Sequence, residues 1–202
     1  MKKLVLLAVL ALALPMAAFA DGGVDYTNSG GTLSGSDSGL SLSGSALIAV
    51  NGLNGGGLIT GSDLGSVSFS TGALSGGSLQ TGGTFAAGGW FTITGNGTNG
   101  VPNATLFSGT FTGPVSWTLV TLANGTHNYT LTGALQGTTN TGYSTVGVTV
   151  QLTINTGKGF FNGSTRISSG DTNVVVPEPG SLTLLGTGLV GVAGAIRRKL
   201  KA

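Results

Sequence analysis

Few side chains in this sequence could carry acid–base or nucleophilic chemistry. The chain of 202 residues has one histidine, His127, no cysteine, and one glutamate, Glu178. A Ser-His-Asp hydrolase would have to use His127, but this residue lies in the polar stretch 124–128 beside a predicted turn, and no nucleophile-elbow pattern is present. We therefore expect His127 to be an exposed loop residue, and we expect no catalytic residues and no enzymatic activity.

Metal chemistry has little to build on. A zinc site needs about three or four His, Cys or carboxylate ligands, which a single histidine cannot supply without several converging aspartates. Asp37 and Asp63 lie in Gly-Ser-Asp contexts whose oxygens could suit calcium, but neither segment matches a calcium-binding loop. Aspartate beside glycine and serine is typical of a turn. We expect turn-forming aspartates, no metal site and no cofactor.

The strongest chemical signal is a recognition pattern near the C-terminal end. Pro177, Glu178 and Pro179 form a stiff segment, because each proline fixes φ and disfavours helix before it. Residues 181–196 carry no charge. A helix of that stretch would reach roughly 24 Å, short of a bilayer core of about 30 Å, so flanking residues would have to complete the span.

A basic cluster follows this apolar run at once. It comprises Arg197, Arg198, Lys199 and Lys201. Such side chains can extend to the membrane interface, and they bias their end of a transmembrane helix towards the cytoplasm. We expect a C-terminal transmembrane helix with its basic end inside and the bulk of the chain outside.

The order of motif, apolar run and basic end, from Val176 to Lys201, resembles the PEP-CTERM sorting signal of exopolysaccharide-producing bacteria. In that family an integral-membrane cysteine protease, exosortase, recognises the Pro-Glu-Pro motif and processes the chain near it. The resemblance implies that residues 177–179 form the processing motif and residues 197–199 the cytoplasmic stop, with an exosortase-like protease and the membrane as partners. The alternative is a plain C-terminal anchor, in which Glu178 only favours the positive end of the helix dipole.

The N-terminal end predicts export. Two lysines precede the apolar run 4–14, and residues 18–20 supply the small-x-small pattern that signal peptidase prefers. This run is short for spanning a membrane and typical of a signal peptide. We expect a signal peptide over 1–20 cleaved between Ala20 and Asp21, an exported domain over 21–175, and a sorting and anchor segment over 176–202.

Without its two ends the chain has a different charge. The formal net charge is +2, but residues 21–176 hold two cations, Lys158 and Arg166, against five aspartates, a net charge of −3. Phosphate recognition needs clustered lysine and arginine, so we expect no nucleic acid partner. Because cysteine is absent, folding relies on packing and backbone pairing rather than on disulfides.

The central region predicts a single all-β domain rich in Gly, Ser, Thr and Asn, a composition that disfavours helices. Apolar and polar residues alternate over 115–120 and 146–154, and Asn124-Gly125 predicts a hairpin turn. Shorter strands are expected over 40–50, 64–70 and 90–94. Strands spaced by about ten residues favour a β-sandwich or jelly-roll-like architecture, whereas the glycine-rich stretch 21–39 is expected to be loose.

Aromatic residues and asparagines leave further possibilities open. We expect Trp90 and Trp117 to fill the core; a carbohydrate-binding face would need Trp90, Trp117 and Tyr129 exposed together. If Phe160 and Phe161 lie on a strand, they must point to opposite faces, so one of them is a candidate exposed contact. Five Asn-x-Ser/Thr sequences, whether turns or glycosylation sites, begin at Asn96, Asn103, Asn124, Asn128 and Asn162.

These observations indicate an exported, non-enzymatic, β-rich protein of the cell envelope or extracellular matrix. We expect anchoring in the inner membrane before processing, and the cell surface or matrix as the final location. A structural or cohesive role is the first hypothesis, with extracellular polysaccharide as a candidate partner. The alternatives are a carbohydrate-binding module and a simple membrane-anchored β-domain.

Overall fold

The computed structural model describes residues 23–175, and they form one antiparallel sheet. These residues contain thirteen strands and one short 3-10 helix, with the bounds β1 Gly23–Ser29, β2 Thr32–Ser36, β3 Gly39–Asn51, η1 Leu53–Gly55, β4 Ile59–Ser70, β5 Leu74–Ser78, β6 Gly82–Phe85, β7 Gly88–Gly95, β8 Thr105–Phe111, β9 Val115–Thr121, β10 His127–Thr139, β11 Ser144–Asn155, β12 Ser164–Arg166 and β13 Ser169–Val175. The all-β prediction is confirmed.

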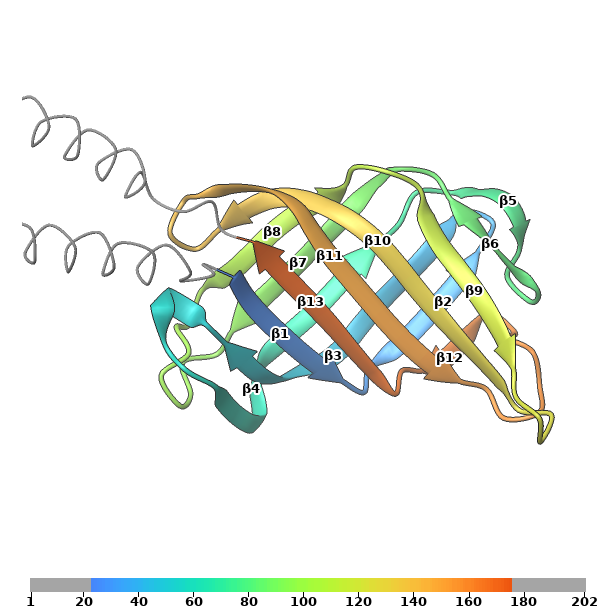
Figure 1. The fold of residues 1–202 in the computed structure, drawn as a ribbon, viewed down its shortest axis with the longest axis horizontal. Helices are drawn as coiled ribbons and strands as arrows, with labels where there is room; N and C mark the ends of the chain where they lie inside the picture. Colours follow the sequence, from blue (N-terminus) through green and yellow to red (C-terminus); the bar gives the residue numbers. More distant parts are fainter. Residues whose placement is uncertain (1–22, 176–202) are drawn as a thin grey trace, which may run out of the picture. The chain divides into compact units, whose positions relative to one another are not determined.

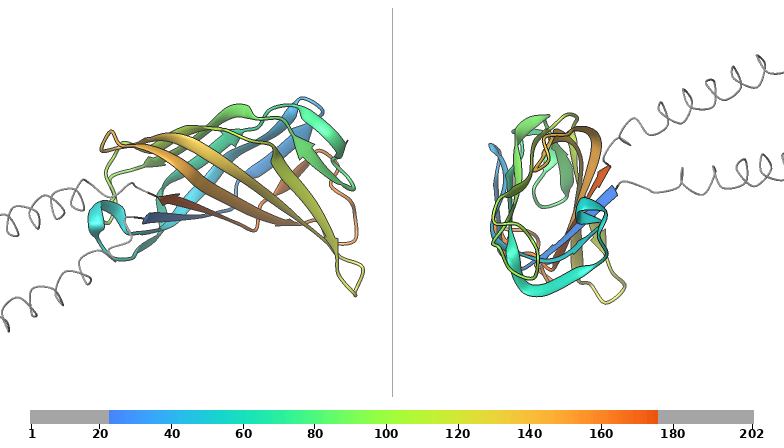
Figure 2. Two further views of the ribbon diagram at one scale, coloured as in Figure 1. Left: turned by 45° about the horizontal axis from the view of Figure 1, so that its top comes forward. Right: turned by 90° about the vertical axis from the view of Figure 1, so that its left-hand side faces the viewer.

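Eight of the strands close into a ring (Figure 1). Starting from β10, the order is β11, β13, β1, β3, β4, β7 and β8, and β8 pairs with β10 again. The end-on view in Figure 2 shows these strands around one interior. The β-sandwich or jelly-roll prediction is therefore wrong, because a single sheet curls back on itself instead of two sheets packing face to face.

Two long strands that change neighbours explain this architecture. One edge of β10 pairs with β9 over residues 127–132 and with β8 over 135–139. In the same way, β3 pairs with β2 over 39–43 and with β1 over residues between 46 and 51. Strands β9, β6 and β5 thus extend from β10, and β2 and β12 extend from β3. The spacing of strands along the sequence does not show that a strand changes its pairing partner. For this reason the spacing alone suggested two separate sheets.

A glycine bulge interrupts the alternation that was predicted over 146–154. Val148 and every second residue after it face the interior, but Val146 is 73% exposed. Gly147 is an extra residue with a φ of 78°, and it separates the pair Leu135–Val148 from the pair of Gln136 with Val146. Glycine adopts this φ without strain, and a bulge bends and twists its strand, which favours a closed sheet.

The stretch 21–39 was expected to be loose, and this is wrong for its described part. β1 pairs with β13 on one edge and with β3 on the other, and Tyr26 and Leu33 are buried. Two neighbouring strands order a glycine-rich segment that has little structure of its own. Because β13 comes from the opposite end of the described chain, the local sequence gave no sign of it.

Predictions that rest on nearby residues succeeded. β9 and β10 form the expected hairpin, in which Leu122 N–H donates to Thr126 O at 2.8 Å and Gly125 N–H donates to Leu122 O at 2.9 Å. Gly125 has a φ of 78°, the conformation for which glycine is suited. The strands predicted over 40–50, 64–70 and 90–94 lie within β3, β4 and β7.

Two aromatic clusters fill much of the interior. The phenylalanine cluster comprises Phe69, Phe91, Phe107 and Phe111, which come from β4, β7 and β8. The Trp117 cluster comprises Trp117 on β9, Tyr129 on β10 and Phe161 in the segment before β12. All seven rings are buried. In a domain with many glycines, these large side chains supply much of the apolar area removed from water.

Candidate functional site

The two ends of the described chain lie on neighbouring strands. β1 begins at Gly23 and β13 ends at Val175, and these two residues pair with each other in the antiparallel ladder. We call the β1–β13 pairing the terminal seam. Asp21 and Gly22 separate the predicted signal-peptide cleavage point from the seam, and one residue separates Val175 from Pro177. The first and last described residues therefore lie side by side, each next in the sequence to one of the two predicted signals.

Side chains on both faces of the terminal seam hold it together. On the outer face, Asn173 Nδ2 donates to Asp25 Oδ1, and Thr27 Oγ1 donates to Asp171 Oδ1 at 3.2 Å. On the inner face lies Tyr26, whose burial raises the pKa of its phenol to about 12, because the charged form would lose its hydration. The other edge of β13 pairs with β11, so the seam is part of the ring.

The residues predicted to carry sorting and export lie outside the described residues. They are Ala20, Asp21, Pro177, Glu178, Pro179, Arg197, Arg198 and Lys199, and the predicted transmembrane helix lies outside as well. Over residues 23–175, no helix is long and apolar enough to cross a membrane. The positions described closest to the predicted signals are thus Gly23 and Val175.

His127 is not the exposed loop residue that was predicted. It is the first residue of β10, is 8% exposed, and stacks on Phe160 with ring centroids 4.4 Å apart. Its backbone N–H donates to Gly157 O at 2.7 Å, and its buried Nδ1 has no hydrogen-bond partner among the described residues. The polar neighbours in the sequence were misleading, because the strand starts at His127 itself and places its ring on the inner face.

The aspartates considered for calcium make contacts within the protein. Asp63 Oδ1 accepts hydrogen bonds from Gly65 N–H and from Asn96 Nδ2, both at 3.2 Å, in the part of β4 that bulges out of the ladder. The carbonyl of Asp37 accepts from Leu74 N–H at 2.9 Å. Within the part of the chain that the structure describes, no three His, Cys, Asp or Glu residues are placed to hold a metal ion.

The aromatic residues differ from the prediction in part. Trp117 and Tyr129 stack in the interior with ring centroids 4.9 Å apart, so the exposed platform of these two residues with Trp90 does not exist. Trp90 was expected in the core, but it is 47% exposed on the outer face of β7. Phe161 is buried and Phe160 is 52% exposed, so one of the pair is exposed as predicted, although neither residue lies on a strand.

Two of the five Asn-x-Ser/Thr sequences form turns. Asn124 Oδ1 accepts hydrogen bonds from the backbone N–H and the hydroxyl of Thr126, at 3.0 and 2.7 Å. Asn96 Oδ1 accepts from the same two groups of Thr98, at 3.1 and 2.6 Å. An asparagine oxygen that bonds the backbone two residues ahead stabilises a turn. Turn chemistry therefore accounts for these two sequences.

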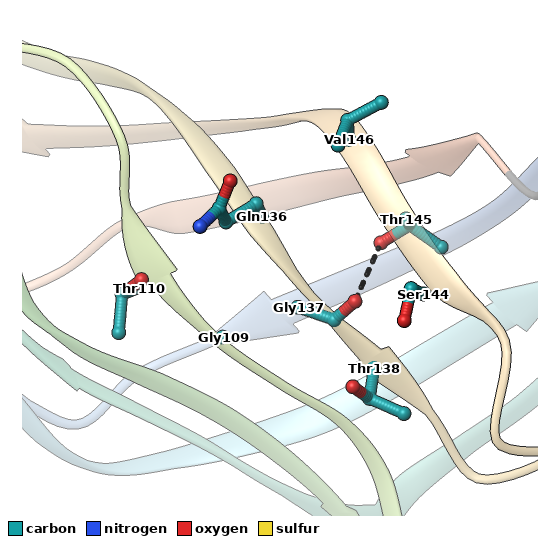
Figure 3. A pocket seen from close by; sticks show the side chains of 8 residues that line it. All are labelled: Gly109, Thr110, Gln136, Gly137, Thr138, Ser144, Thr145 and Val146. Atoms are coloured by element: carbon teal, nitrogen blue, oxygen red, sulfur yellow. Dashed lines mark hydrogen bonds between the residues drawn. The ribbon is translucent and has the colours of Figure 1, made fainter.

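Sequence reasoning missed a shallow groove on the outer face of the sheet, where β8, β10 and β11 lie side by side (Figure 3). Its volume is about 460 Å³, and its lining consists of Gly109, Thr110, Gln136, Gly137, Thr138, Ser144, Thr145 and Val146. Thr145 Oγ1 donates to Gly137 O at 3.4 Å. Each of these residues is ordinary by itself, and only the register of three strands brings them together.

Two glycines form the floor of this groove. Gly109 and Gly137 pair directly across the β8–β10 ladder. A Cβ at Gly109 would come within 2.4 Å of Gln136 O, and one at Gly137 within 2.2 Å of Ser108 O; each would also meet the buried ring of Phe107. These contacts are too close for any side chain. A Cβ at either position would point inward to that ring, so glycine is needed for packing, and the outward side of this backbone forms the floor of the groove.

The C-terminal end of the chain has a recognisable counterpart. Residues 175–199 match the family model of the PEP-CTERM protein-sorting motif. The chain carries a PEP-CTERM motif. The match confirms the resemblance seen in the sequence, and it begins at Val175, the residue with which β13 ends. The PEP-CTERM motif indicates exosortase-dependent sorting to the cell envelope. No curated protein and no solved structure matches the chain.

Proposed function

We propose that this protein is a non-enzymatic structural or cohesive component of the cell envelope or extracellular matrix. In this proposal, signal peptidase cuts between Ala20 and Asp21, and the C-terminal helix holds the protein in the inner membrane with Arg197, Arg198 and Lys199 in the cytoplasm. An exosortase-like protease then cuts near Pro177, Glu178 and Pro179 and passes the domain to the cell surface or matrix, where extracellular polysaccharide surrounds it.

The observation that carries this proposal is the pairing of Gly23 with Val175. A cut before Asp21 leaves β1 whole, and a cut at or after Pro177 leaves β13 whole. Both strands belong to the closed ring, so their loss would open it. Since an extended residue spans at most about 3.6 Å, the motif starts within about 7 Å of Val175. Processing so close to the sheet can release the domain without removing any strand.

The surface chemistry suits a coat or filler. Among residues 23–175 there are six charged side chains, and two of them, Asp25 and Asp171, hydrogen-bond within the terminal seam. Outward positions along the strands are mainly serine, threonine, asparagine and glycine. Such a neutral, hydroxyl-rich surface can hydrogen-bond to water, to sugars and to further copies of the chain without strong electrostatic preference.

The non-enzymatic assignment draws on where the titratable groups lie. His127 faces inward against Phe160, Asp63 bonds to Gly65 and Asn96, and Asp171 bonds to Thr27. These groups belong to different parts of the sheet and are occupied by structural contacts. General acid–base catalysis would require such a group to be free to reach a substrate proton in a concave site.

The mass of the mature C-terminus tests the sorting step. In producing cells, the wild-type protein should end close to Pro179, whereas Glu178→Ala, or deletion of the protease, should leave residues 200–202 in place. Lys158→Ala, at an exposed position within the described domain, serves as the control, with processing expected at the wild-type rate. An intact tail in wild-type cells would instead make this a simple membrane-anchored β-domain.

A second candidate function is carbohydrate binding, and the exposed ring of Trp90 is the observation that favours it. Indole faces provide a large, flat apolar area for stacking. This candidate is compatible with the sorting step, because a sugar-binding domain would be delivered by the same route.

A further inference from the structure

Trp90 lies next to the outer-face groove, although it does not line it. Across the β7–β8 ladder, Phe91 pairs with Gly109 and Gly88 with Phe111, and a register shift between them leaves Trp90 beside Thr110. Phe91 is buried while Trp90 and Thr110 are exposed, so both side chains stand on the outer face. Opposite residues of neighbouring strands have Cβ atoms about 5 Å apart.

The register continues this row across the groove. Thr110 pairs with Gln136, and Gln136 pairs with Val146. A second row runs beside the first, in which Thr138 pairs with Ser108 on one side and Ser144 on the other. Each row crosses several strands at about 4.8 Å per strand, so the first row extends about 14 Å from Trp90 to Val146. This length suits a chain of sugars better than a single ring.

The chemistry of the two rows selects the ligand. Gln136 offers an amide donor and an amide acceptor, and each threonine and serine hydroxyl can donate and accept. A sugar presents hydroxyls around its edge and an apolar C–H face that stacks on an indole. None of the eight lining residues is charged. A carboxylate or sulfate placed there would lose hydration without gaining a counter-charge, so the ligand is neutral.

We propose that the groove and Trp90 form a binding site for a neutral polysaccharide chain, with Trp90 stacking on one sugar and Gln136, Thr110, Thr138 and Ser144 hydrogen-bonding to the next ones. This site rests on the second candidate function and gives it a location and a ligand class. The backbone of Gly109 and Gly137 forms the floor of this site, between the outward side chains that would contact the sugar. The bulge at Gly147 holds Val146 outward, where it adds an apolar rim.

A second hollow on the outer face argues for the importance of Trp90. It has a volume of about 190 Å³ and is lined by Ser34, Gly35, Ser36, Gly39, Ser41 and Gly163. Its serines also offer hydroxyls, but its lining residue nearest to Trp90 by register, Ser41, lies two strands from β7, whereas Thr110 of the first groove lies on the strand next to β7. Hydroxyl contacts alone exchange water for sugar at little net gain, whereas stacking adds apolar burial. We therefore assign the polysaccharide to the groove beside Trp90.

The experiment uses the protein as producing cells export it and a panel of neutral chains: α-glucan, β-glucan, mannan, galactan and xylan. The protein has two tryptophans, Trp90 exposed and Trp117 buried, so acrylamide quenching of the fluorescence reports mainly on Trp90. At least one neutral chain should reduce this quenching. Polygalacturonate, which is acidic, should not. If no neutral chain protects Trp90, or if the acidic chain protects it best, the proposal is overturned.

Calorimetry with the best neutral chain then locates the site. Trp90→Ala should weaken binding about tenfold or more, and Gln136→Ala should weaken it about fivefold. The matched controls are Phe160→Ala, an aromatic of similar exposure, and Gln151→Ala, an exposed glutamine further along β11. Both controls should bind as wild type does. If the controls lost as much affinity as Trp90→Ala and Gln136→Ala, the groove would not be the binding site. This outcome would leave the result of the sorting test on Glu178 unchanged.

Discussion

The two aromatic clusters of this domain lie inside the same sheet but are held in different ways. In the phenylalanine cluster, Phe91 stacks on Phe69 at 5.9 Å and meets Phe111 edge-on at 6.3 Å, and no polar atom takes part. In the Trp117 cluster, Trp117 Nε1 donates to Leu79 O at 2.9 Å, and Tyr129 Oη donates to Gln80 O at 2.6 Å. One cluster depends on packing alone, and the other adds directed hydrogen bonds.

The two clusters differ in this way because they connect different parts of the sheet. The phenylalanine cluster comes from β4, β7 and β8, three adjacent strands whose ladders already fix their positions. The Trp117 cluster joins β9 and β10 to the β5–β6 turn at residues 79–80 and to the segment before β12. Turns have fewer ladder bonds, so polar tips on buried rings supply the specific attachments that packing cannot give.

Phe91→Ala should have the largest effect on stability. Phe91 contacts three other rings and is fully buried, so its loss removes apolar area and leaves a cavity among neighbours fixed by their strands. We expect the free energy of unfolding to fall by about 3–5 kcal/mol, measured by urea denaturation. Phe160→Ala, where the ring is 52% exposed, should cost less than about 1 kcal/mol. Equal losses would mean that the cluster contributes little.

A buried ring outside both clusters, Tyr26 in the terminal seam, predicts a pH dependence. Burial raises its pKa from 10.0 to about 12, so the folded state favours the neutral phenol. The contribution of the neutral Tyr26 phenol to the free energy of unfolding is fully present below pH 10. It falls as the pH rises towards 12 and is lost above that pH. It amounts to about 2–3 kcal/mol. Stability measured between pH 9 and 12 should therefore fall more steeply in the wild type than in Tyr26→Phe, and parallel curves would contradict the assignment.

The parts of the fold that could be predicted are those set by neighbours in the sequence. The hairpin at Asn124-Gly125 needs a residue with positive φ, and the pair asparagine-glycine is a strong sequence signal for such a turn. Alternation predicted β9 and most of β11 for a similar reason. The terminal seam could not be predicted, since Gly23 and Val175 stand at opposite ends of the described chain. The local sequence around each residue does not indicate which distant strand it pairs with. Ring closure depends on such pairs.

The candidate sites divide in the same way. The PEP-CTERM motif is linear, so its order of residues was sufficient to identify it, and the match over 175–199 confirmed it. The outer-face groove depends on the register of β8, β10 and β11, and the position of Trp90 beside it depends on a shift in the β7–β8 ladder. His127 was misplaced because the start of β10 fixes its direction and polar neighbours do not. Residue types alone cannot supply these facts.

Tyr129→Phe is the most selective test of the difference between the two clusters, and its expected effect is the smallest. The phenol oxygen of Tyr129 donates to Gln80 O and accepts from Phe161 N–H at 3.1 Å. Phenylalanine keeps the ring stacked on Trp117 but leaves both backbone groups without their partner, which should cost about 1–2 kcal/mol. Tyr143→Phe, the same chemical change at a 47% exposed ring, should cost almost nothing.

Hydrogen exchange can distinguish an aromatic side chain that is fixed by packing alone from one that is also fixed by hydrogen bonds. If the phenol of Tyr129 attaches the segment before β12, Tyr129→Phe should raise the exchange rate of the Phe161 amide more than that of amides in β7 and β8. Phe91→Ala should raise exchange in β7 and β8 more than at Phe161, because the side chains that Phe91 contacts lie on strands of the closed sheet and not in the turns. If Tyr129→Phe and Tyr143→Phe behave alike, the hydroxyl bonds add nothing measurable. The Trp117 cluster would then be held by packing, as the phenylalanine cluster is.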